Sequence, residues 1–116
     1  NFVLDLIHSA KGIAVMAHPV MFNNTELLLE LIEAGKLDGI EAYHHSATPA
    51  QQQKLVDIAK EHDLIVTGGS DFHGLYNETM THIGSMTTDK ENLDKLFKLI
   101  HINSQKANKA AVKTEK

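Results

Sequence analysis

Histidine and aspartate side chains occur at three places where a short apolar run of the sequence gives way to polar residues. The three segments read Ala17-His18-Pro19, Tyr43-His44-His45-Ser46 and Ser70-Asp71-Phe72-His73. Imidazole and carboxylate groups are ligands that proteins use for divalent ions such as zinc, manganese and iron. With eight His among 116 residues, the sequence predicts a metal-dependent site that is built from these segments.

Asp71 and His73 are the strongest pair of candidate ligands. Residues two apart in an extended chain project from the same face, so both side chains could reach one ion or a close pair of ions. Three glycines would let the backbone turn tightly around them, namely Gly68, Gly69 and Gly74. The alternative is that Asp71 caps a turn while His73 is an ordinary surface residue.

His18, His44 and His45 follow the two earlier apolar runs. His18 is either a metal ligand or a core histidine, and we expect its backbone to be extended because Pro19 follows it. Adjacent residues of a strand point to opposite faces, so at most one of His44 and His45 should face the site, and we favour His44. Glu41 lies deeper in its strand, which suits an inward-facing residue or a partner of a ligand better than a general base.

Apolar periodicity defines the elements that must position these residues. It predicts helices over 2–11, from Asn24 to Gly35, over 49–62 and from Thr88 onward, and strands over 13–17, 39–43, 64–67 and 83–86. Alternating strands and helices indicate an α/β protein with a parallel sheet, whose strands all end at the same edge. Ligand sites lie at that edge because the loops converge there, so the three polar segments should face one crevice.

Three stretches of the chain resemble the last strands of the PHP (polymerase and histidinol phosphatase) family of metal-dependent phosphoesterases. They read Ile13-Ala14-Val15-Met16-Ala17-His18-Pro19, Asp38-Gly39-Ile40-Glu41-Ala42-Tyr43-His44 and Val66-Thr67-Gly68-Gly69-Ser70-Asp71-Phe72-His73-Gly74. The similarity spans about residues 10 to 85 and is greatest to the branch that hydrolyses nucleotides and short RNA ends. It implies that the chain is the C-terminal portion of a distorted (β/α)7 barrel.

The resemblance also implies a site with two or three divalent ions, usually manganese, zinc or iron. His18, Asp71 and His73 would be metal ligands, while His44 and His45 would contact the substrate phosphate or help to protonate the leaving group. The family's opening His-x-His motif and its middle His and Glu ligands belong to the N-terminal half, and no His-x-His occurs in this sequence. We therefore expect the chain alone to be inactive and to bind metal weakly or not at all.

Composition sets the remaining expectations. Apolar residues make up 42% and charged residues 22% of the chain, which is typical of one globular domain. We expect residues 1–103 to form the C-terminal part of a PHP domain, and the Lys-rich segment 104–116 to be frayed or an extended helix end. The absence of Cys suits a cytoplasmic protein. No apolar run approaches the roughly 20 residues that span a bilayer, so no membrane is expected as a partner.

The predicted activity of the parent protein is metal-dependent hydrolysis of phosphoesters in nucleotides or at the 5′ ends of short nucleic acids. The loop with Tyr76, Asn77 and Glu78 either closes over the site or is ordinary surface. Two other functions stay open. One is a metal-dependent amidohydrolase-like enzyme, because the same ligands polarise carbonyl groups. The other is a non-catalytic lobe that associates with itself through a truncated sheet edge.

Overall fold

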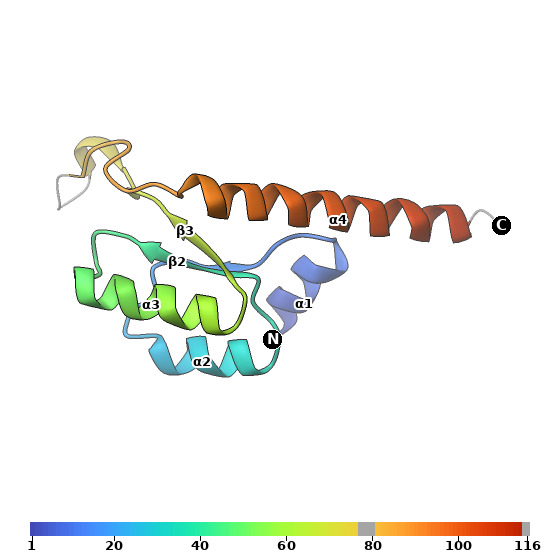
Figure 1. The fold of residues 1–116 in the computed structure, drawn as a ribbon, viewed down its shortest axis with the longest axis horizontal. Helices are drawn as coiled ribbons and strands as arrows, with labels where there is room; N and C mark the ends of the chain where they lie inside the picture. The colour runs from blue at the N-terminus through green and yellow to red at the C-terminus, as the bar shows by residue number, and fades with distance from the viewer. Residues whose placement is uncertain (77–80, 115–116) are drawn as a thin grey trace.

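The structure is a computed structural model that describes residues 1–76 and 81–114. Helices and strands alternate along the chain (Figure 1). In order they are α1 (Phe2–Ser9), β1 (Val15–Met16), α2 (Thr25–Glu33), β2 (Gly39–Tyr43), α3 (Pro49–Glu61), β3 (Ile65–Gly68), a 3-10 turn η1 (Gly74–Tyr76) and α4 (Lys90–Thr114). The predicted α/β class is confirmed. Asn77 and Glu78, which the sequence places in a possible lid, lie outside the described residues.

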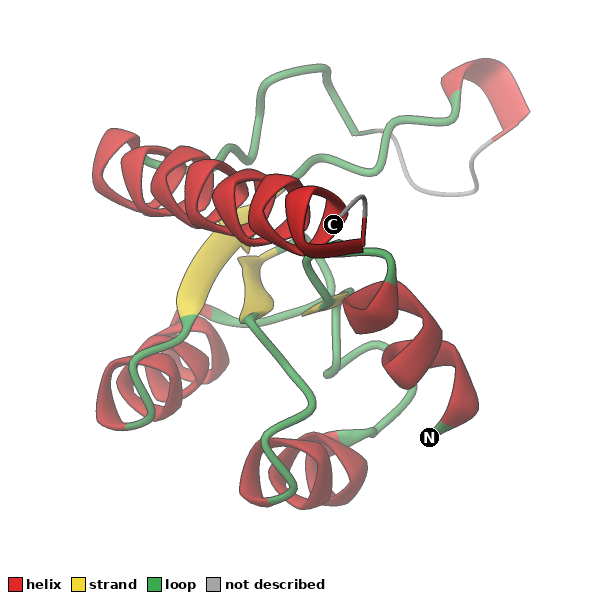
Figure 2. Ribbon diagram, turned by 90° about the vertical axis from the view of Figure 1, so that its right-hand side faces the viewer, coloured by secondary structure: helices red, strands yellow, loops and turns green. Residues whose placement is uncertain are grey.

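The three strands form one parallel sheet in the order β1-β2-β3. α2 and α3 lie on one side of this sheet, and α4 lies on the opposite side (Figures 1 and 2). Because the strands are parallel, their carboxyl ends share one edge, and each of the three polar segments follows one strand. The topology therefore brings together residues that are more than 25 positions apart in sequence.

The core lies between the sheet and the two crossover helices. The side chains buried there are Ala14, Leu28, Ile32, Leu37, Ile40, Ala42, Leu55, Val56, Ala59 and Val66. Apolar residues of α2 point inward at helical spacing, while β2 contributes a nearly continuous buried run, as expected for a strand covered on both faces. This packed layer fixes the positions of the strand ends that carry the candidate site.

Local sequence signals account for α3 in detail. The Thr48 hydroxyl accepts a hydrogen bond from the Gln51 N–H at 3.2 Å, and the Gln51 side chain accepts one from the Thr48 N–H at 2.8 Å. This is a complete capping box, with Pro49 in the first helical turn. The helix begins where the sequence predicts and ends at Glu61, one residue earlier than expected.

Two predictions at the start of α4 are wrong. Residues 83–86 form a turn instead of a fourth strand. The helix predicted from Thr88 begins at Lys90, and Thr88 does not cap it, because its hydroxyl binds the N–H and the carbonyl of Gly68 at 3.0 and 3.3 Å. Asp89 caps it instead, with its carboxylate accepting from the Asn92 N–H at 2.9 Å. The segment before α4 is thus used to hold the end of β3.

The free edge of β3 is covered by side chains from the segment before α4 and from the first turn of α4. Asn92 accepts a hydrogen bond from the Val66 N–H at 2.8 Å, and Thr88 binds Gly68 as described. Two outward donors of the edge strand are therefore satisfied within the chain, which makes this edge less available for pairing with another strand.

Residues 104–114 of the Lys-rich segment are helical, because α4 runs without interruption to Thr114. The distal part of α4 projects beyond the sheet (Figure 1).

Among residues 1–76 and 81–114, no helix is both long enough and apolar enough to cross a bilayer.

Candidate metal centre

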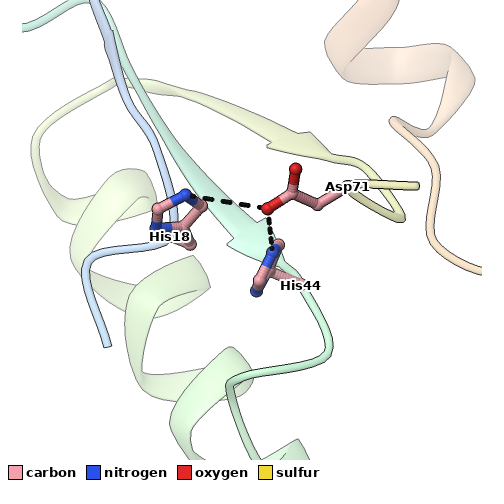
Figure 3. A group of neighbouring side chains, drawn as sticks. All are labelled: His18, His44 and Asp71. Carbon is pink, nitrogen blue, oxygen red and sulfur yellow. Dashed lines mark hydrogen bonds and ion pairs between the residues drawn. The ribbon is translucent and has the colours of Figure 1, made fainter. Parts of the chain in front are cut away.

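His18, His44 and Asp71 converge at the carboxyl edge of the sheet, one from the loop after each strand (Figure 3). One potential ligand atom from each residue lies within 4.8 Å of the other two. The three side chains differ in environment, because His44 is buried while His18 and Asp71 are partly open to solvent. Together they form the candidate metal centre of this chain.

His18 adopts a backbone conformation that non-glycine residues rarely use. Its φ is +25°, so the prediction of an extended backbone before Pro19 is wrong. The His18 N–H donates to Glu41 Oε1 at 3.2 Å, which anchors the turned loop to β2. Glu41 thus acts as a support for a candidate ligand, one of the two roles expected for it. Uncommon backbone conformations of this kind often occur at functional sites.

His44 is the most buried polar residue of the site, with 1% of its area exposed. Its Nε2 lies 3.3 Å from Asp71 Oδ2, and its Nδ1 lies 2.7 Å from the Ser46 hydroxyl. The Ser46 backbone N–H also donates to Nδ1, at 3.1 Å. Both ring nitrogens are therefore engaged, and the ring is held firmly in one orientation.

Asp71 stands among three imidazoles. Its carboxylate oxygens lie 3.3 Å from His44 Nε2, 3.4 Å from His73 Nδ1 and 4.0 Å from His18 Nε2. The hydrogen bond with His44 is the main factor that lowers the pKa of Asp71 below its ordinary value of 3.8, and the nearby His73 acts in the same direction. The carboxylate therefore stays ionised under ordinary conditions, as a metal ligand must.

The donor set and its spacing fit a divalent ion. Two ligand atoms that are each about 2.1 Å from a tetrahedral zinc ion lie roughly 3.4 Å apart. The separations of Asp71 Oδ2 from the nearest nitrogens of His44 and His18, 3.3 and 4.0 Å, are close to that value. Two imidazoles and one carboxylate also match the ligand preferences of zinc, manganese and iron.

His73 lies beside this cluster rather than inside it. The chain is not extended at Asp71, where φ is +52°, so the prediction that both side chains share one face of an extended segment is wrong. The His73 ring is 61% exposed, and its Nδ1 lies 2.6 Å from the Asp71 carbonyl oxygen. A carbonyl can only accept, so Nδ1 carries the proton and the Nε2 lone pair points away, free for a ligand role elsewhere.

His45 does not point away from His44 as a regular strand would require. The two ring centroids are 4.1 Å apart, because β2 ends at Tyr43 and a register shift between Glu41 and Tyr43 already disturbs the strand. The favoured residue of the pair, His44, is the one that contacts Asp71. The sequence placed His44 among substrate-contacting groups, whereas the structure groups it with the candidate ligands.

Ser46 is a site residue that sequence reasoning did not identify. The signal available was its position in a polar strand end, two residues after His44. Among the glycines of the third segment, Gly74 has a φ of +68°, while a Cβ on Gly68 would collide with the Thr87 carbonyl oxygen. Gly74 thus permits a turn, and Gly68 permits close packing of the backbone.

We expect titration of Asp71 in this chain to reveal its interaction with His44. A carboxyl group whose pKa is lower in the folded state than in the unfolded state stabilises the fold above its unfolded pKa, and this contribution is lost as the pH falls through the folded value. Carbon-13 NMR should give a pKa below 3.8 for Asp71, and Asp71→Asn should reduce the pH dependence of stability in the acid range. A measured pKa at or above 3.8 would contradict the placement of His44 Nε2.

A parallel sheet that presents imidazoles and a carboxylate at its carboxyl edge could hold a divalent ion. Known phosphodiesterases and exoribonucleases are similar to this chain. No family model matches it. A phosphoribosyl 1,2-cyclic phosphate 1,2-diphosphodiesterase of Eggerthella lenta is 40% identical over 73 residues, which are 63% of this chain and 27% of that protein.

Two exoribonucleases give similar matches. A 5′-3′ exoribonuclease of Haemophilus influenzae is 40% identical over 74 residues, covering 60% of this chain and 27% of that protein. The 5′-3′ exoribonuclease Rnm of Escherichia coli is 32% identical over 74 residues, covering 60% and 25%. The matched part of the chain thus spans about a quarter of the length of these curated relatives.

A solved structure is also similar to this chain. A Bifidobacterium adolescentis protein, provisionally assigned as a metal-dependent phosphoesterase, superimposes with a TM-score of 0.71 at 33% identity, over 84% of this chain and 35% of that protein. The resemblance of this chain to part of a PHP-family metal-dependent phosphoesterase is therefore confirmed.

Proposed function

We propose that this chain forms one part of a metal-dependent hydrolase that cleaves phosphoesters of nucleotides or of short nucleic acids at their 5′ ends. The observation that carries the proposal is the convergence of His18, His44 and Asp71 at the carboxyl edge of a parallel sheet. The names of the relatives, a cyclic phosphate diphosphodiesterase and 5′-3′ exoribonucleases, support phosphoesters over amides as substrates.

We also propose that the sheet is an arc of a distorted (β/α)7 barrel. Its strands follow one another in chain order, and both crossover helices lie on the same side (Figure 2). A barrel requires both features, whereas a doubly wound sheet reverses its strand order. The match to about a third of a solved phosphoesterase chain is consistent with an arc of a larger fold.

Within the complete site, His18, His44 and Asp71 would hold a divalent ion of manganese, zinc or iron. Such an ion supplies Lewis-acid stabilisation of the phosphate charge. Asp71 contributes the negative charge, and His44 is better suited to a ligand role than to proton transfer because it is buried and both its nitrogens are engaged. His45, partly buried with its ring tilted against that of His44, is the group that we assign to protonation of the leaving oxygen.

His73 would serve a second ion of the site. Its Nδ1 proton is donated to the Asp71 carbonyl oxygen, which leaves Nε2 as a donor atom directed away from the first cluster. A set of two or three ions with shared carboxylate support is typical of phosphoryl-transfer chemistry, in which both the attacking and the leaving oxygens carry charge.

The absence of Cys supports a cytoplasmic location for the protein.

The experiment compares substrates and chain lengths. The complete hydrolase that contains this chain should turn over nucleotide phosphoesters or 5′-phosphorylated short RNA in the presence of manganese or zinc, and should leave amide substrates intact. The 116-residue chain alone should show no turnover and weak metal binding, because it supplies only part of the ligand set. Turnover of amides in preference to phosphoesters, or robust turnover by this chain alone, would refute the proposal.

Self-association has one observation in its favour. Apolar side chains are exposed on α1 and α4, among them Phe2 at 80%, Leu6 at 57% and Phe97 at 60%. Such surfaces tend to be covered by a partner or by further chain. Light scattering of this chain distinguishes the outcomes, since a clean monomer at high concentration would count against self-association.

A further inference from the structure

The proton on the His44 ring can be located from the groups around it. The Ser46 backbone N–H, 3.1 Å from Nδ1, can only donate, so Nδ1 must accept in this structure. A neutral imidazole has one ring proton, which therefore lies on Nε2 and is donated to the Asp71 carboxylate at 3.3 Å. This tautomer satisfies every ring atom that can form a hydrogen bond.

Coordination of an ion by His44 requires the opposite tautomer. Of the two ring nitrogens only Nε2 faces Asp71, and its lone pair must be free to bind an ion. The ring proton then has to be on Nδ1. There it meets the Ser46 N–H, which cannot accept, and the Ser46 hydroxyl at 2.7 Å, which can.

The Ser46 hydroxyl is suited to both arrangements. A hydroxyl can donate to Nδ1 in one tautomer and rotate to accept from Nδ1–H in the other. The turn that places it is fixed by hydrogen bonds to the His44 carbonyl oxygen, from the Ala47 N–H at 3.1 Å and the Gln52 side chain at 3.4 Å. With His44 almost fully buried, water is poorly placed to substitute as an acceptor.

We propose that Ser46 is a positioning residue that allows His44 to change from its Nε2–H to its Nδ1–H tautomer when an ion binds. The proposal rests on the proposed metal-dependent function. The ring keeps one proton in both states, so the change relocates a proton without a net loss from His44. Without the hydroxyl, Nδ1–H would be a buried donor that has lost its acceptor, and ion binding would carry that cost.

Nitrogen-15 NMR of histidine side chains in this chain, combined with zinc titration, tests the proposal. The metal-free protein should show His44 as the Nε2–H tautomer, and millimolar zinc should shift it to Nδ1–H. Ser46→Ala should weaken zinc binding by about 10- to 100-fold, the usual effect of losing a hydrogen-bond partner of a ligand. Ser46→Thr, which keeps the hydroxyl, should restore most of the affinity.

Ser9→Ala serves as the matched control, because the Ser9 hydroxyl donates to the Leu6 carbonyl oxygen on the exposed surface of α1. Equal zinc affinity of Ser46→Ala and the unmodified chain would overturn the role of Ser46 and leave the proposed function intact. Retention of Nε2–H in the zinc-bound state would overturn it as well. If the unmodified chain and the complete hydrolase both fail to bind zinc, the proposed function and this inference fail together.

Discussion

Replacement of Asp71 by Asn should abolish metal-dependent turnover in the proposed complete hydrolase and remove the ion that we assign to it. Asp71 is the one residue of the cluster that contacts each of three imidazoles, His18, His44 and His73, and it carries the only negative charge of the group. The amide is nearly the same size, but it cannot offer an anionic oxygen. Loss of a partner of a ligand commonly costs 10- to 100-fold in metal affinity or activity, so we expect loss of the ligand itself to cost at least about 100-fold.

Metal content by mass spectrometry and turnover of a nucleotide phosphoester measure this effect. Asp57→Asn is the matched control, because Asp57 is an exposed residue of α3 whose carboxylate accepts from Gln53 at 2.8 Å. The control should retain both metal and activity. An Asp71→Asn protein with unchanged metal content and turnover would show that the cluster is not the metal site.

Truncation of Leu28 to Ala should destabilise the fold by about 2–5 kcal/mol, the usual cost of a buried large-to-small change. Leu28 has no exposed surface and packs in the core between α2 and the sheet. The substitution leaves a cavity under the strands whose ends carry the candidate site. Stability of a domain this small is only of the order of 5–15 kcal/mol, so the loss is a large share of the total.

Urea unfolding followed by circular dichroism gives the difference in free energy. Leu29→Ala is the control, since the adjacent Leu29 is 41% exposed on the same helix and should cost much less. Similar losses for the two variants would contradict the orientation of α2 and, with it, the position of the core.

Elements with strong local signals could be predicted from the sequence. The capping box at Thr48 defines the start of α3 to the residue, and the apolar run of 39–43 gives β2 its observed bounds. Helix starts without a unique cap could not be predicted. Thr88 and Asp89 are both good caps by type, and only tertiary structure, in which Gly68 engages Thr88, leaves the cap to Asp89.

The location of the candidate site could be predicted, but the directions of its side chains could not. Strand ends in a parallel sheet share one edge whatever the local detail, so His18, His44 and Asp71 were expected near one another. The orientations of these side chains depend on positive φ values at His18 and Asp71 and on a register shift in β2. The alternating pattern of side chains along a regular strand predicts neither feature. For this reason the structure groups His44 with Asp71 and leaves His73 at the margin.

The most direct test of the account is anomalous diffraction from crystals of this chain that are soaked in millimolar zinc or manganese. We expect an anomalous peak about 2.0–2.2 Å from one nitrogen each of His18 and His44 and from an oxygen of Asp71. Even weak binding should give partial occupancy at that concentration. Crystals with no peak there, or with ions bound only at histidines elsewhere on the surface, would contradict the assignment of these three residues as a metal centre.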